Sequence, residues 1–153
     1  MPARIFQINS SPGGVPKRAL RAAVVDELGI RGDEHNDKRH HGGPDRALVI
    51  YSLEHLLVLQ AEGHPIFPGS IGENVTITGL DWAALSPGTR LKLGQIEAQV
   101  TGYASPCDTI RGSFADGNFS RVGQKKNPGW SRLTLRILKP GQITVGDLIT
   151  VES

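Results

Sequence analysis

Glycine and proline recur along the whole chain and leave only short segments between them. The 153-residue sequence has 19 glycines and 10 prolines, scattered rather than gathered into one linker, with runs rich in valine, isoleucine and threonine between them. Glycine and proline end regular elements, and β-branched residues favour strands, so this pattern favours a barrel or sandwich over a helix bundle. We expect a mainly β chain with a few helices (α+β) and a barrel-like core.

Eight segments have the length and composition of strands. We predict strands at 3–9, 22–28, 46–51, 73–78, 89–93, 95–102, 133–138 and 147–152. The stretch TRLKLGQIEAQV predicts a hairpin that turns at Gly94 and Gln95. The C-terminal stretch PGQITVGDLITVES is typical of a closing strand with a Gly-Asp turn at its middle.

The stretch SLEHLLVLQAEG (52–63) carries the signals of a helix. Ser52 is a good N-cap, and Gly63 suits the C-terminal exit. Leu53, Leu56 and Leu57 would line one face, so we expect this helix to cover the barrel.

Length and composition indicate an ordinary soluble protein with one domain over residues 1–153. The chain is 38% hydrophobic, its net charge is +2, and no dense basic tract suggests a nucleic-acid partner. No apolar run approaches the ~20 residues of a membrane span, and the N-terminus has no secretion signal. We therefore expect a cytoplasmic protein. Its single cysteine excludes an intramolecular disulfide and any multi-cysteine metal site.

That cysteine, Cys107, lies in the stretch YASPCDTIRGSF, where a second helix is expected to begin. Ser105 would be the N-cap and Pro106 the first helical residue, with Asp108 completing a capping box. A thiol in the first turn of a helix is favoured as thiolate by the free amide N–H groups there, and Arg111 would add a cation on the same face. This placement suits a nucleophile or a soft metal ligand. The alternative is a small buried hydrophobe, since cysteine is among the most buried residue types.

A loop rich in histidine and glycine, GDEHNDKRHHGGPDR (32–46), precedes the third predicted strand. Its flexible backbone N–H groups and its cations suit a phosphate or another anion. The candidate binding residues of this loop are Lys38, Arg39, His41, Asp45 and Arg46. The alternative is a solvated polar loop with a Gly-Gly-Pro-Asp turn.

A zinc site built from His35, His40 and His41 is disfavoured. Adjacent histidines point apart on an extended chain, and the spacing matches no fixed-element zinc motif.

The stretch FPGSIGENVTIT places Glu73 and Asn74 at the start of a strand, after a glycine-rich turn. A carboxylate and an amide there could hydrogen-bond the N–H and C=O groups of a heterocycle such as a pterin. The alternative is that both side chains satisfy the backbone of the turn.

Together, RHHGGPDRALVIYSLEH, FPGSIGENVT and the cysteine in YASPCDTIRGSF resemble the MOSC family, named for the C-terminal domain of molybdenum-cofactor sulfurases. The resemblance spans nearly the whole chain. The chain is similar to the small stand-alone bacterial members of the family. It implies a MOSC-type β-barrel-like core that binds the molybdenum cofactor (molybdopterin). Cys107 would be the catalytic residue and molybdenum ligand, or a sulfur carrier. Lys38, Arg39, His41 and Arg46 would face the pterin phosphate, with Glu73 and Asn74 in the family's GEN motif.

Two family activities follow from the resemblance: sulfur transfer to the cofactor, and molybdenum-dependent reduction of N-hydroxylated compounds. The chain lacks the pyridoxal-phosphate domain of full sulfurases, so a pyridoxal-phosphate role is not supported. It also has no ferredoxin-type cysteine cluster, so reduction would need an electron-donor protein. The leading hypothesis is a reductase of N-hydroxylated compounds. The alternative is a non-catalytic sulfur or cofactor carrier that delivers to an acceptor protein. A monomer and a homodimer both stay open, and the substrate is not indicated.

Overall fold

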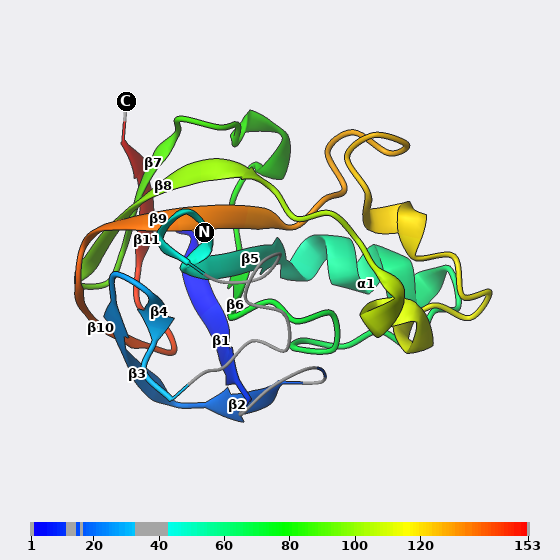
Figure 1. Cartoon of the computed structure of the whole chain (residues 1–153), viewed down its shortest axis with the longest axis horizontal. Helices are drawn as coiled ribbons and strands as arrows, with labels where there is room; N and C mark the ends of the chain where they lie inside the picture. The colour runs from blue at the N-terminus through cyan, green and yellow to red at the C-terminus, as the bar shows by residue number, and fades with distance from the viewer. Residues whose placement is uncertain (1, 12–14, 16, 33–42, 153) are drawn as a thin grey trace.

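The structure is a computed structural model that describes residues 2–11, 15, 17–32 and 43–152 (Figure 1). Its strands are β1 (Arg4–Ser10), β2 (Arg18–Leu20), β3 (Ala22–Asp26), β4 (Gly29–Ile30), β5 (Leu48–Ser52), β6 (Val75–Thr78), β7 (Arg90–Leu93), β8 (Ile96–Tyr103), β9 (Leu133–Lys139), β10 (Gly141–Thr144) and β11 (Ile149–Glu152). Its helices are the α-helix α1 (Leu53–Ala61) and the 3₁₀ helices η1 (Pro44–Arg46), η2 (Trp82–Ala84), η3 (Asp108–Ser113) and η4 (Phe119–Val122).

All eight predicted strands are confirmed, and the protein is mainly β with few helices. Three strands were missed for identifiable reasons. All three residues of β2 are exposed, and β4 has only two residues, so neither has an apolar pattern to detect. The predicted closing strand is in fact two strands, because the turn at Val145 and Gly146 separates β10 from β11.

Eight strands form one sheet in the order β11-β7-β8-β9-β5-β6-β1-β2. The prediction of a barrel-like core is wrong, because this sheet does not close. Near the start of β11, Leu148 forms an isolated bridge with Arg4 of β1, and Ile5 N–H donates to the carbonyl of Asp147 at 2.9 Å. A few backbone hydrogen bonds join the segments around β11 and β1 here, including Ile149 N–H to the carbonyl of Ala3, but the ladder of β11 runs along β7.

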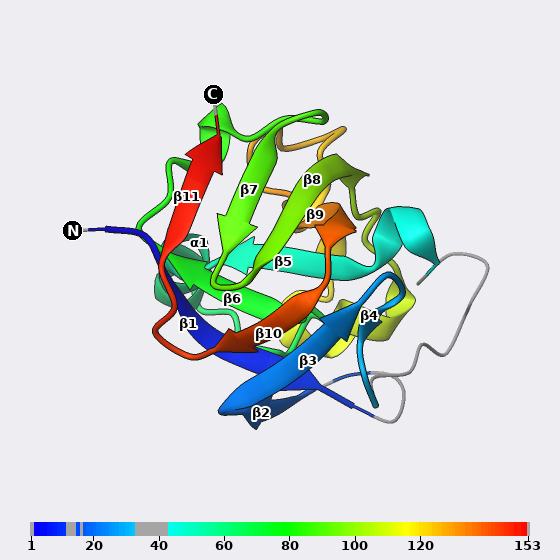
Figure 2. The same ribbon diagram turned by 90° about the vertical axis from the view of Figure 1, so that its left-hand side faces the viewer.

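A second sheet has the strand order β10-β3-β4, and Figure 2 shows its three strands side by side. Its inward residues Val25, Ile30 and Ile143 belong to the same buried cluster as the large sheet. One close backbone approach fixes β4. A Cβ added at Gly29, whose φ is +116°, would lie 2.2 Å from the carbonyl oxygen of Ala47. Only glycine fits there, and Ala47 directly follows η1.

The helix α1 continues from the end of β5 and packs beside β5 and β6 (Figure 1). As predicted, Ser52 caps it: the backbone N–H of His55 donates to the Ser52 hydroxyl at 3.1 Å. The predicted apolar face is partly wrong, because Leu56 and Leu59 are buried while Leu57 is 53% exposed. No helix in the described part of the chain has the length and apolar character that a membrane span needs.

Candidate functional site

The histidine–glycine loop is described only from Gly43 onward. Lys38, Arg39 and His41, like the other loop histidines, lie outside the described residues, so their predicted contacts with an anion stay predictions. The described residues contain no cluster of three or more histidine, cysteine, aspartate and glutamate side chains that could hold a metal ion.

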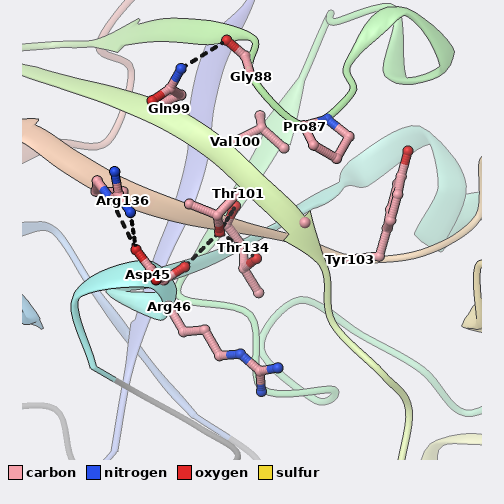
Figure 3. Close-up of a pocket in the computed structure, with 11 residues that line it drawn as sticks. Asp45, Arg46, Pro87, Gly88, Gln99, Val100, Thr101, Tyr103, Thr134 and Arg136 are labelled. Carbon is pink, nitrogen blue, oxygen red and sulfur yellow. Dashed lines mark hydrogen bonds and ion pairs between the residues drawn. The ribbon is translucent and has the colours of Figure 1, made fainter.

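Asp45 anchors the described end of this loop on the large sheet (Figure 3). Its carboxylate forms an ion pair with Arg136 on β9, with Nε 2.9 Å from Oδ1. Its backbone carbonyl accepts the hydroxyl of Thr101 on β8 at 2.5 Å. Figure 3 shows the side chain of Arg46 extending away from this ion pair. The sequence placed Asp45 and Arg46 together but did not indicate the strands that receive them.

These contacts border an open, polar groove of about 540 Å³. Its lining includes Asp45, Arg46, Thr101, Tyr103, Thr134 and Arg136. Hydroxyl and guanidinium groups dominate this set, so the groove can receive a polar or anionic group at the surface.

Asn74 is 1% exposed and joins three strands. Its side-chain oxygen accepts the N–H of Val49 at 2.8 Å, and its backbone carbonyl accepts the N–H of Asn9 at 2.7 Å. These bonds hold β5 and β1 at the start of β6. The contacts match the alternative in which this side chain satisfies backbone, and a role toward a pterin stays a prediction.

Glu73 is fully buried, and its carboxylate is only partly satisfied. Oε2 accepts the hydroxyl of Thr76 at 3.1 Å, whereas Oε1 has no hydrogen-bond partner among the described residues. Burial raises the pKa of the Glu73 carboxyl above its ordinary value of 4.5. Hydrogen bonds from the backbone N–H groups of Gly69 and Glu73 oppose this rise most, followed by the bond from Thr76 and the charge of Arg132. A buried carboxylate oxygen without a partner is unusual in proteins.

The Glu73→Gln variant is expected to change how stability depends on pH. The pKa of Glu73 is higher in the folded than in the unfolded chain, so its contribution to stability is present below pH 4.5 and is lost as pH rises through the folded-state pKa. The amide does not ionise. The difference in unfolding free energy, variant minus wild type, should therefore increase with pH. Urea unfolding at several pH values measures it, and parallel curves for both proteins would contradict the assignment.

Cys107 lies in a loop between β8 and η3, and its side chain is half-buried. The predicted helix start is wrong. Helix η3 begins at Asp108 and is a 3₁₀ helix, and its N-cap is Cys107 itself with extended dihedrals (φ −141°, ψ 176°). No side chain caps η3. The predicted activation by an α-helix N-terminus therefore does not describe this cysteine.

The sulfur of Cys107 instead has a side-chain partner. Its Sγ lies 2.8 Å from the hydroxyl oxygen of Thr109. Arg111, predicted to place a cation beside the thiol, pairs with Asp108, its Nε lying 2.7 Å from the carboxylate Oδ1. The guanidinium of Arg111 also lies 5.7 Å from the ring centre of Phe119. A cofactor-binding role for Arg111 stays a prediction.

Arg132, just before β9, is the site residue that the sequence did not indicate. Its side chain is buried, with 5% of the residue exposed, and it bridges two predicted segments. One guanidinium nitrogen donates to the carbonyl of Ile71 at 2.8 Å, and the other donates to the carbonyl of Ser105 at 3.3 Å. The GEN turn and the cysteine loop therefore share one side chain. Arg132 directly precedes β9, and the sequence around it carries no local signal that separates its buried side chain from the exposed one of Arg136.

The family model of the MOSC domain matches residues 37–150, and the chain belongs to this family. YiiM of Escherichia coli (strain K12) is 29% identical over 148 residues, 90% of this chain and 65% of its own length. YflK of Bacillus subtilis (strain 168) is 28% identical over 87% of this chain and 60% of its own length. The chain thus spans less than two thirds of these two relatives.

A third relative, named a reductase, comes from Gibberella moniliformis; it is 30% identical over 80% of this chain and 22% of its own length. Among solved structures, the YuaD protein of Bacillus subtilis has a TM-score of 0.75 at 20% identity, covering 100% of this chain and 97% of its own. YiiM of Geobacillus stearothermophilus has a TM-score of 0.73 at 23% identity, and the match covers 99% of this chain and 76% of that protein. These likenesses establish the fold.

Proposed function

We propose that this chain binds the molybdenum cofactor through Cys107 and reduces N-hydroxylated compounds with electrons from a separate donor protein. The observation that carries the proposal is the position of Cys107 in a MOSC chain. The residue is half-buried. The carbonyl of Ser105 in its loop accepts a hydrogen bond from the buried guanidinium of Arg132. A half-buried sulfur in a positioned loop remains accessible to a ligand.

Three features of the residues present fit this cofactor. Cys107 supplies a soft thiolate ligand of the kind that molybdenum accepts, beside the soft dithiolene ligands that belong to the cofactor. Beside the cysteine loop, Oε1 of Glu73 and Nε of Arg132 are buried polar atoms without partners in the described chain. Arg46 and the loop cations Lys38, Arg39 and His41 would bind the phosphate.

The proposed reaction takes up two electrons and two protons. The N–O bond of R–NHOH breaks, the nitrogen leaves as the amine R–NH₂ and the oxygen leaves as water. The bound cofactor supplies the redox centre that passes the electrons to substrate. Cys107 holds that centre, and the polar lining of the groove would receive polar parts of a ligand. The printed name of the Gibberella relative, a reductase, favours this reaction class.

Repeated turnover is the test of the enzyme assignment. Protein purified from a host that makes the cofactor is mixed with an aryl hydroxylamine and reduced methyl viologen, and the amine is quantified per bound molybdenum. We expect many amines per molybdenum. At most one amine per molybdenum would contradict the enzyme assignment and favour a carrier that delivers sulfur or cofactor to an acceptor protein.

A further inference from the structure

The backbone around Arg132 is held by hydrogen bonds from two buried aromatic side chains and from one backbone N–H group. The hydroxyl of Tyr51 donates to the carbonyl of Trp130 at 2.7 Å, and the indole N–H of Trp82 donates to the carbonyl of Ser131 at 3.0 Å. The carbonyl of Arg132 accepts the N–H of Ala104 at 3.0 Å. The carbonyls of three consecutive residues, 130 to 132, thus accept hydrogen bonds, and these bonds fix the backbone from which the Arg132 side chain extends.

The buried charge of Arg132 is not neutralised by a contacting acid. No ion pair among the described residues includes it, although Glu73 and Cys107 are close enough to act on its charge. Burying an unpaired guanidinium is costly, and a core position would ordinarily favour an apolar residue. An arginine at this buried position therefore calls for a role that an apolar side chain could not fill.

The contacts of the guanidinium identify that task. Its two terminal nitrogens donate to Ile71, at the entrance of the GEN turn, and to Ser105, two residues before the cysteine. Both acceptors are carbonyls of irregular backbone, outside every strand and helix. A planar fork with donors in fixed directions can set the spacing of two such segments, whereas an ammonium group cannot.

We propose that Arg132 is a positioning residue that fixes Cys107 relative to the GEN turn by bridging the carbonyls of Ser105 and Ile71. The expectation that this bridge helps the protein to retain the cofactor rests on the proposed function. The bridge itself is a property of the apoprotein. Arg132 acts through the cysteine loop and is assigned no contact with substrate.

Three side chains at position 132 separate the possible roles. Methionine keeps apolar volume without charge, lysine keeps charge without the fork, and arginine has both. Backbone amide hydrogen exchange is measured on each apoprotein by mass spectrometry, with the exposed β7 variant Arg90→Met as the control. We expect Arg132→Met to speed exchange about tenfold or more in segments 69–74 and 104–110, with the β7–β8 hairpin unchanged. Arg132→Lys should give a smaller increase, and Arg90→Met none.

Several outcomes would overturn the assignment. If Arg132→Lys exchanges at the wild-type rate, a positive charge alone is enough to position the two segments. If Arg132→Met exchanges at the wild-type rate, apolar packing alone is enough. A uniform increase that includes the β7–β8 hairpin would mean general destabilisation. If Arg132→Met does not fold, Arg132→Lys alone decides by the same pattern. Molybdenum content, measured separately, should fall in the order Arg, Lys, Met. Wild-type protein without molybdenum would refute the proposed function and leave the exchange result to decide the role of Arg132.

Discussion

Replacing Cys107 by alanine lowers kcat/KM for an N-hydroxylated substrate by more than about a hundredfold, in our expectation. Loss of a residue that merely supports a metal ligand already costs about 10–100-fold, and Cys107 is proposed as the ligand itself. Alanine leaves no atom that can bind the metal. Steady-state amine formation with reduced methyl viologen, normalised to protein concentration, measures the effect.

Thr109→Val provides a graded comparison for this result. It removes the hydroxyl that lies 2.8 Å from the Cys107 sulfur and keeps the shape of the side chain. One hydrogen bond to sulfur is lost, so a decrease of a few-fold to about tenfold is expected. Equal activity in wild type and Cys107→Ala would remove Cys107 from the mechanism, whatever Thr109→Val does.

Gly29→Ala is expected to lower the free energy of unfolding by about 2–5 kcal/mol. A left-handed backbone conformation costs a non-glycine residue about 1–2 kcal/mol, and overpacking adds about 1–3 kcal/mol. Both apply at Gly29, where φ is +116° and an added Cβ would lie 2.2 Å from the carbonyl oxygen of Ala47. The displaced backbone directly follows η1, so the groove beside Asp45 should be disturbed as well.

Gly32→Ala is the matched control. It places alanine at a positive φ, as Gly29→Ala does, but without a close contact to another residue. Its φ is +87°, and an added Cβ would meet nothing within 4 Å. Only the conformational cost of about 1–2 kcal/mol is expected there. Urea denaturation of both variants gives the comparison, and equal losses of stability would show that the contact with Ala47 does not matter.

The strands were predictable because their signal is local. In β8, residues 96, 98 and 100 are buried while 97, 99 and 101 are half-buried, so alternation in the sequence maps directly onto the sheet. The hairpin at Gly94 was predictable for the same reason, since Leu93 pairs with Ile96. The failure to close into a barrel was not predictable, because it depends on where β11 meets β1, far apart in the sequence.

The candidate site was only partly predictable, and the reason is again distance in sequence. Cys107, Glu73 and Asp45 stood out because their neighbours form recognisable stretches. Arg132 did not, since nothing local distinguishes a strand arginine that turns inward from one that faces solvent, as Arg136 does. The 3₁₀ start at Asp108 was missed because the SPCD signature fits an α-helix equally well. The single-domain organisation and cytoplasmic location stay predictions.

The most direct test of the account is molybdenum content. Wild type and Cys107→Ser are purified from a host that makes the cofactor, and molybdenum and pterin per folded chain are measured. The serine hydroxyl is a hard ligand of nearly the same size, so folding should be kept while affinity falls. We predict that wild type retains molybdenum and that Cys107→Ser loses most of it. Equal molybdenum content in the two proteins would contradict the assignment of Cys107 as its ligand.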